Sequence, residues 1–170
     1  PRGWRYLAQT ALTAVGLIVA LGLTILDWVK GEVRLTAEGL LALDGPTYVF
    51  WSLLLVVGLG GMALFAERQL GGGHSAFAAS ASTVPGSPLE REAERLRREH
   101  TEIFPLLVFA IFGMMLFVAA NNLLVLFVAV EILSLPLYLL TAMARRRRLL
   151  SQEAALKYFL LGSLASAIML

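Results

Sequence analysis

Five long apolar runs, separated by polar connections, dominate the hydropathy pattern of this chain. Each run is close to the roughly 20 residues that a helix needs to cross about 30 Å of hydrocarbon. The alternating pattern of a membrane β-barrel is absent, and an isolated strand would leave its backbone unpaired in lipid. The pattern therefore predicts an all-α membrane protein with about five transmembrane helices. The runs cover residues 7–26, 48–66, 103–120, 123–144 and 154–170.

The connections divide the chain into three parts. The connection 27–47 is short and mixed, and Asn121-Asn122 predicts a tight turn. The longest connection is small and polar at first, which is typical of flexible chain, and then highly charged and helix-prone, with Ser87 and Pro88 as the predicted helix start. We therefore expect two leading transmembrane helices in 1–66, a loop with a flexible segment and a charged helix in 67–102, and three helices in 103–170.

Basic residues are distributed unevenly between the two sides of this predicted topology. Eleven of the 14 Lys and Arg fall on the side of the N-terminus, and only two fall on the other side. Because cytoplasmic loops carry the excess of positive charge, the skew predicts a cytoplasmic N-terminus. The eleven are Arg2, Arg5, Arg68, Arg91, Arg95, Arg97, Arg98 and Arg145 to Arg148; the two are Lys30 and Arg34.

Composition excludes several classes of protein. Hydrophobic residues make up 58% of the chain, charged residues 15%, and the mean hydropathy is +0.77, which a soluble domain of this size could not bury. There is no cysteine, and His74 and His100 stand far apart, so no metal site is expected. Nothing suggests a nucleic-acid partner. The chain begins at Pro1 and stops inside an apolar run, so we expect it to be a fragment of a longer protein.

Glu131 is the most informative single residue. It lies nine residues after Asn122, near the predicted middle of the membrane. A charged side chain there costs at least about 2.5–3.5 kcal/mol on insertion scales, so it must face protein or water. Such a carboxyl can take up and release protons as its surroundings change. The alternative is a permanently protonated Glu131 that makes a structural hydrogen bond between helices.

Three further residues of the same helix bear on this interpretation. Ser134 and Tyr138 lie three and seven residues after Glu131 and share its face, so the three make a polar stripe. Pro136 removes one backbone hydrogen bond and frees the carbonyl of Ile132. The stripe is either a hydrated lining or ordinary hydrogen bonding between helices.

Lys157 is the second candidate site residue. It lies near the cytoplasmic end of the last run, where a lysine can extend to the membrane surface. Its position is therefore compatible with a site residue inside the membrane and also with an ordinary surface lysine. Glu153 and Lys157 are four residues apart and predict a helix-surface ion pair. The arginines 145–148 are typical of a topology anchor near anionic headgroups.

The segment VEILSLPLYLLTAMARRRRLLSQEAALKYFLL, residues 130–161, carries a resemblance. It resembles the antiporter-like, proton-translocating membrane subunits of respiratory complex I (NADH-quinone oxidoreductase), and among them the subunit N family. The matching sequence motifs are E-I-L-S-L-P-L-Y, from Glu131 to Tyr138, and E-A-A-L-K-Y-F, from Glu153 to Phe159. Residues 1–66 match the family only in their helix pattern.

The resemblance implies a fold and two site residues. Members have fourteen helices, with two inverted repeats of five helices after three leading helices, and this chain would supply helices two to six. Glu131 would be the proton-channel glutamate of the fifth helix, and Lys157 a lysine of the sixth. The glutamate's partner, a lysine on the seventh helix, lies outside this chain.

The resemblance also implies a role in a larger complex. This chain would bind no cofactor or metal itself, whereas NAD, FMN, iron–sulfur clusters and quinone would belong to partner subunits. Its partners would be other membrane subunits and the lipid bilayer, and its location would be a bacterial inner membrane. The expected function is proton pumping coupled to electron transfer from NADH to quinone. Two alternatives stay open: a cation/proton antiporter or membrane-bound hydrogenase subunit of the same fold, and a non-catalytic membrane scaffold.

Overall fold

Five long helices make up most of the part of the protein that the structure describes. The computed structural model describes residues 2–66, 77, 87–88, 102–144 and 148–169. A short antiparallel hairpin of two strands joins the first two long helices, so the predicted all-α class is confirmed with one small β addition. The elements are α1 (Arg2–Lys30), β1 (Arg34–Thr36), β2 (Leu41–Leu43), α2 (Gly45–Ala66), α4 (Ile103–Ala119), α5 (Leu123–Met143) and α6 (Arg148–Met169).

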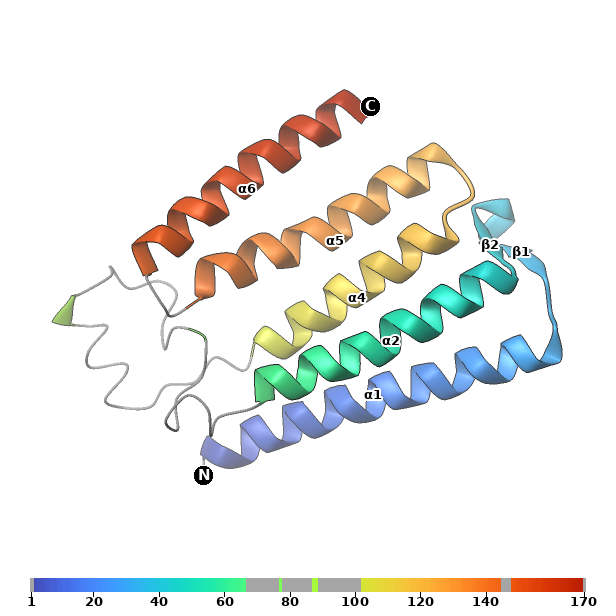
Figure 1. Cartoon of the computed structure of the whole chain (residues 1–170), viewed down its shortest axis with the longest axis horizontal. Coiled ribbons are helices and arrows are strands. Elements are labelled where there is room, and N and C mark those ends of the chain that lie inside the picture. The colour runs from blue at the N-terminus through green and yellow to red at the C-terminus, as the bar shows by residue number, and fades with distance from the viewer. Residues whose placement is uncertain (1, 67–76, 78–86, 89–101, 145–147, 170) are drawn as a thin grey trace.

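The long helices lie side by side in the spatial order α1, α2, α4, α5, α6 (Figure 1). α1 also packs against α4, whereas α6 contacts α5 alone among the described helices. The start of α1, the end of α2, the start of α4, the end of α5 and the start of α6 share one end of the molecule, and the hairpin and the α4–α5 turn share the other (Figure 1). Successive helices therefore run in opposite directions, as a chain that crosses a membrane repeatedly requires.

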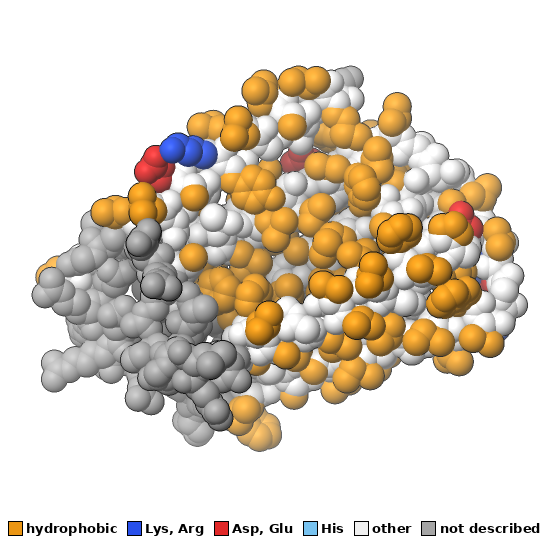
Figure 2. Space-filling view, in the orientation of Figure 1, with side chains coloured by type: hydrophobic (Ala, Val, Ile, Leu, Met, Phe, Trp, Pro, Cys, Tyr) orange, Lys and Arg blue, Asp and Glu red, His pale blue; other side chains and the backbone are white. Residues whose placement is uncertain are grey.

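Three of the described helices are long and apolar enough to span a membrane, judged by length and composition alone. They are Tyr6–Lys30 within α1, Gly45–Ala66 and Leu123–Met143. α4 is also apolar but has 17 residues. Large apolar side chains are exposed along these helices, such as Leu12 at 74% and Leu64 at 73% (Figure 2). Apolar surface of this extent is expected where a helix faces lipid or further membrane helices rather than water.

The core lies where α1, α2, α4 and α5 meet. Phe104, Ile103 and Leu55 are fully buried there. Tyr6 of α1 packs edge-on against Phe104, with 5.3 Å between the ring centroids. At the same end, Phe77 is buried and its ring packs edge-on against Phe65 of α2 at 5.1 Å. The first contact joins α1 to α4 and the second joins α2 to Phe77, both near the N-terminal end.

The hairpin was not predicted, because the connection 27–47 has no periodic pattern. Arg34 pairs with Leu43 and Thr36 with Leu41 across the two strands. The reversal between them uses left-handed backbone, with φ of 57° at Glu38 and 86° at Gly39. The hairpin is tied to the α4–α5 turn by Asn121, whose side-chain nitrogen donates to the carbonyl of Gly39 at 2.8 Å.

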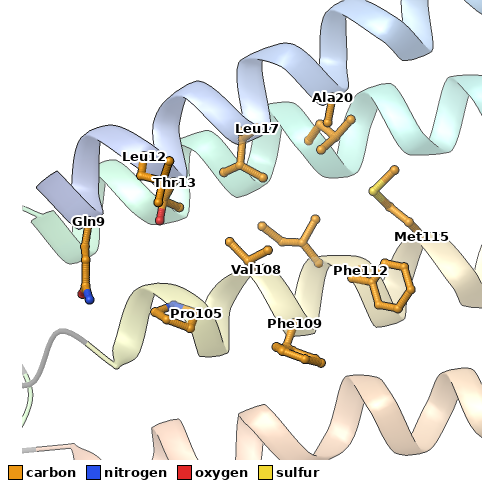
Figure 3. Close-up of a pocket in the computed structure, with 13 residues that line it drawn as sticks. Gln9, Leu12, Thr13, Leu17, Ala20, Pro105, Val108, Phe109, Phe112 and Met115 are labelled. Atoms are coloured by element: carbon orange, nitrogen blue, oxygen red, sulfur yellow. The ribbon is translucent and has the colours of Figure 1, made fainter.

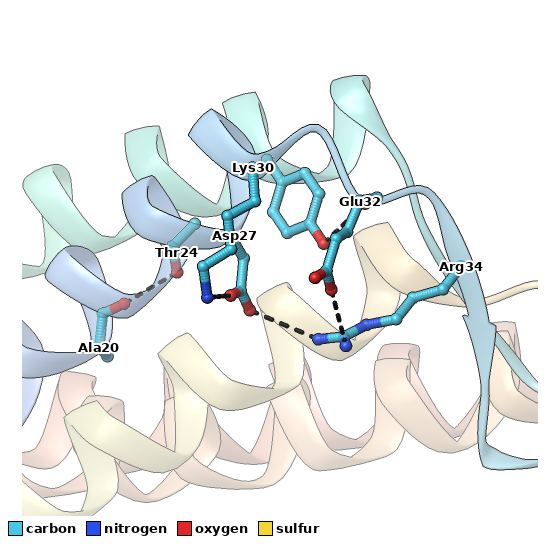
Figure 4. A network of polar contacts seen from close by, with 7 residues as sticks. Ala20, Thr24, Asp27, Lys30, Glu32 and Arg34 are labelled. Atoms are coloured by element: carbon cyan, nitrogen blue, oxygen red, sulfur yellow. Dashed lines mark hydrogen bonds and ion pairs between the residues drawn. The ribbon is translucent and has the colours of Figure 1, made fainter.

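Polar contacts order the hairpin end of α1 (Figure 4). The Arg34 guanidinium lies 3.5 Å from the Asp27 carboxylate and 3.0 Å from that of Glu32. Lys30 lies 3.7 Å from Asp27, and the Tyr48 hydroxyl donates to the backbone carbonyl of Glu32 at 3.2 Å. Because the ion pairs are exposed, each contributes little free energy, and the buried Tyr48 is the firmer link between hairpin and α2.

Several helix boundaries differ from those predicted, most clearly those of α1 and α6. α1 extends beyond the apolar run 7–26 at both ends, since a helix continues into the interface where polar residues can face water. α6 begins at Arg148, so the second half of the expected loop 145–152 is helical; Gln152 and Glu153 are good helix formers. The predicted charged helix beyond Pro88 lies in 89–101, outside the described residues.

Candidate functional site

α5 carries the candidate carboxyl and is one continuous helix from Leu123 to Met143. Asn122 caps its start, because its side-chain oxygen accepts a 2.8 Å hydrogen bond from the backbone amide of Val125. Pro136 lies inside the helix, as predicted. The helix therefore carries Glu131 through its middle without a break.

Glu131 is half-buried on this helix. Its carboxyl has no hydrogen bond or ion pair with any other residue that the structure describes. All of its helical neighbours from Leu123 to Val130 are apolar. A carboxyl in such surroundings needs a proton, water or a cation from outside the described chain.

The position of Glu131 is fixed by close contact between α4 and α5. Gly113 of α4 faces the backbone of Ile132 and Leu133, so closely that a Cβ at Gly113 would lie 2.7 Å from the Leu133 Cα and 3.0 Å from the Ile132 carbonyl carbon. Only glycine permits this approach. The two helices are thus in backbone contact directly beside Glu131.

The polar stripe of α5 continues toward α6. Ser134 is half-buried, and Tyr138 is buried with 9% of its surface exposed. The Tyr138 ring packs edge-on against two aromatic side chains of α6, Tyr158 and Phe159. The stripe therefore leads from Glu131 to the α5–α6 interface.

Lys157 lies on the exposed surface of α6. Its ammonium is 2.6 Å from the carboxylate of Glu153, one helical turn earlier, which confirms the predicted surface pair. The side chains of Lys157 and Glu153 are 68% and 56% exposed. The structure does not pair Lys157 with Glu131, so the two candidate residues are separate groups here.

An apolar groove of about 620 Å³ lies between α1 and α4 (Figure 3). Gln9 and Thr13 are its polar lining residues, and within the described part of the chain no titratable side chain lines it. The groove is therefore separate from Glu131 and offers no group that could carry a proton. Nor do the described residues contain a cluster of His, Asp and Glu side chains that could hold a metal ion.

Residues 120–170 of the chain match the family model described as NADH:quinone oxidoreductase/Mrp antiporter, TM. Among its relatives, NADH-quinone oxidoreductase subunit N of Cutibacterium acnes is 57% identical over 100% of this chain, and that of Nocardioides sp. is 56% identical over 100%. The chain belongs to the antiporter-like membrane subunits of NADH-quinone oxidoreductase. The recognition made from residues 130–161 is confirmed.

The extent of these matches places the chain within the family fold. It covers 31% of the Cutibacterium relative and 33% of the Nocardioides relative, about a third of their length. The solved respiratory complex I from Thermus thermophilus with bound Aureothin contains a chain that is 33% identical, with a TM-score of 0.67. The match covers 95% of this chain and 29% of that one. The five helices are thus part of the larger antiporter-like fold.

Sequence reasoning missed two glycines at the helix contacts of this site. Gly162 and Ser166 are a small-residue pair four residues apart, a pattern too frequent in membrane helices to specify a function, and no such pair marks Gly113. A lone glycine inside an apolar helical run, as at Gly113, was the available signal, since such a glycine costs helix stability unless it permits a contact.

Proposed function

We propose that this chain supplies part of a proton path in a proton-translocating membrane subunit of NADH-quinone oxidoreductase. The observation that carries the proposal is Glu131: a half-buried carboxyl in the middle of an apolar helix, with no partner among the described residues. A carboxyl so placed changes its proton affinity when water or a cation approaches or leaves. Family membership supports a proton as the species that it handles.

Electron transfer from NADH to quinone occurs in partner subunits, where NAD, FMN, iron–sulfur clusters and quinone bind. Conformational change there alters the surroundings of Glu131 and its access to the two sides of the membrane. Such coupling requires two states that differ in their interaction with the carboxyl. The backbone contact at Gly113 makes α4 the helix whose movement would most directly displace this part of α5.

Lys157 has the second role in this proposal. Its ammonium lies at the surface of α6 beside Glu153, where water reaches both groups. It helps to pass protons between the cytoplasmic side and the path inside the membrane. This assignment takes the N-terminal end of the molecule as cytoplasmic, in a bacterial inner membrane, with the Lys and Arg skew as its support.

The substitution Glu131→Gln tests the proposal in the complete subunit within its assembled complex. The amide keeps the size and hydrogen bonding of the acid but cannot release a proton. NADH-driven proton uptake into inverted vesicles should fall strongly, with complex content on a native gel unchanged. Glu131→Asp keeps a titrating group one methylene shorter and should retain part of the activity. Parent-like uptake by Glu131→Gln at equal content would favour a scaffold role instead.

A cation/proton antiporter is the second candidate, because the matching family model is described by both activities. The two differ in their driving force. An antiporter exchanges protons for sodium or potassium without NADH, whereas the proposed subunit needs NADH oxidation. Vesicles given a sodium gradient and no NADH separate them: proton movement that Glu131→Gln abolishes under those conditions would favour the antiporter.

A further inference from the structure

Tyr138 of α5 is in close contact with Gly162 of α6. The Tyr138 ring centroid lies 4.7 Å from that of Tyr158 and 5.7 Å from that of Phe159, both nearly perpendicular. Its hydroxyl lies against Gly162, where an added Cβ would overlap the hydroxyl oxygen and stand 2.9 Å from the ring carbon Cζ. The hydroxyl thus occupies the space that a side chain at position 162 would fill.

These contacts fix the direction in which the phenol points. The ring meets α6 at Tyr158 and Phe159, and the hydroxyl meets it further along, at Gly162. Because α5 and α6 run in opposite directions, further along α6 means back toward the start of α5 (Figure 1). The phenol therefore points along its own helix toward Glu131, as helical side chains generally lean toward the N-terminus.

The hydroxyl of Tyr138 has no hydrogen-bond partner among the described residues. Tyr138 is 9% exposed and its hydroxyl oxygen is not fully enclosed, so water or another polar group has access to it, and a phenol in apolar surroundings normally finds such a partner. Ser134 and Glu131 are the polar residues on the same face of α5. The Cα atoms of Tyr138 and Glu131 are about 10 Å apart along the helix axis, so a connection between hydroxyl and carboxyl would run through water or the Ser134 hydroxyl.

We propose that Tyr138 is a positioning residue for Glu131, and that Gly162 holds the Tyr138 hydroxyl in place. The hydroxyl orders the polar chain that connects the Glu131 carboxyl with α6, the helix that carries Lys157. This inference rests on the proposed proton-translocating function. It assigns a role to the α5–α6 interface that the aromatic packing alone would not require.

Two substitutions test the hydroxyl and its place separately, in the complete subunit within its assembled complex. Tyr138→Phe keeps the ring contacts with α6 and removes only the hydroxyl, whereas Gly162→Ala keeps the hydroxyl and pushes it aside. Both should lower NADH-driven proton uptake several-fold relative to complex content. Gly60→Ala is the matched control, because Gly60 lies on an exposed face of α2 with open space at its Cβ position. It should pump like the parent.

A spectroscopic measurement separates positioning from packing. The infrared band of the protonated carboxyl that Glu131→Gln removes should shift in Tyr138→Phe, since the hydrogen-bonded chain at the carboxyl has changed. The double variant Tyr138→Phe with Gly162→Ala relieves most of the overlap, so it should assemble normally and still pump poorly. Recovery of pumping in the double variant would mean that only packing mattered, and would overturn the proposal.

The result for Tyr138→Phe decides the proposal even if Gly162→Ala fails to assemble. Parent-like proton uptake together with an unshifted carboxyl band in Tyr138→Phe would overturn it. If Glu131→Gln is impaired in the same experiment, the proposed function stands and only the role of Tyr138 falls. If Glu131→Gln itself pumps like the parent, the proposed function fails and this inference fails with it.

Discussion

Gly113 of α4 lies directly against the backbone of Leu133 in α5, two residues beyond Glu131. A Cβ added at Gly113 would lie 2.5 Å from the Leu133 nitrogen and 2.7 Å from its Cα, distances that real side chains do not adopt. Since the neighbour is backbone and not a flexible side chain, it cannot move aside alone. The contact therefore sets the separation of α4 and α5 at the level of the candidate carboxyl.

Gly113→Ala should force α4 and α5 apart. Overpacking of this kind costs about 1–3 kcal/mol, so we expect less assembled complex on a native gel and a lower temperature of inactivation. Gly60→Ala on α2 is the control, because its Cβ position is open and alanine favours the helix by up to about 1 kcal/mol over glycine. Equal stability of both variants would contradict the close approach at Gly113.

Lys157→Ala should reduce proton uptake less than Glu131→Gln does. Lys157 is 68% exposed, so water can substitute for it, whereas nothing described can substitute for the carboxyl of Glu131. Because exposed ion pairs contribute little free energy, complex content should stay unchanged. Glu153→Gln is the control for the ion pair: it breaks the pair but keeps the ammonium, and should pump like the parent. A matching defect in Glu153→Gln would assign the effect to the pair.

The sidedness of the chain can be tested by cysteine labelling, since residues 1–170 contain no cysteine, with the unsubstituted subunit as the background for labelling. Ser75→Cys lies in the connection 67–102, predicted to be cytoplasmic, and Val33→Cys lies at the hairpin end, where Val33 is 76% exposed. A membrane-impermeant maleimide added to intact cells should label Val33→Cys and leave Ser75→Cys unlabelled. The reverse pattern would invert the proposed orientation.

The sequence predicted the helices and the unusual carboxyl because both follow from local physical rules. An apolar run of about 20 residues in this composition can only be a helix, and a glutamate inside it stands out by its cost alone. The surface pair of Glu153 and Lys157 followed from their spacing. Whether Glu131 and Lys157 transfer protons stays a prediction, since that depends on groups beyond the described residues.

The contacts between helices could not be predicted in the same way. Gly113 meets Leu133 and Gly162 meets Tyr138 only because of how α4, α5 and α6 are rotated against one another, and periodicity does not reveal rotation in helices that are apolar all round. The hairpin was missed because its two three-residue strands are too short for a pattern. Its stability comes from distant partners such as Asn121 and Tyr48.

The hairpin end of α2 should loosen when its cap is removed. Asp44 accepts hydrogen bonds from the hydroxyl and the backbone amide of Thr47, at 2.7 and 3.0 Å, and these bonds lower the pKa of Asp44 below its usual value. Asp44→Ala should cost about 1 kcal/mol and speed hydrogen exchange of the Thr47 and Tyr48 amides at neutral pH, whereas Asp44→Asn, a comparable cap, should not. Because the pKa of Asp44 is lower in the folded than in the unfolded chain, its carboxylate stabilises the fold fully at pH values above the unfolded-state pKa. This stabilisation is lost as the pH falls through the folded-state pKa. The difference in exchange between parent and Asp44→Ala, corrected for intrinsic rates, should therefore shrink in acid; a difference that stayed constant would show that the carboxylate charge is not involved.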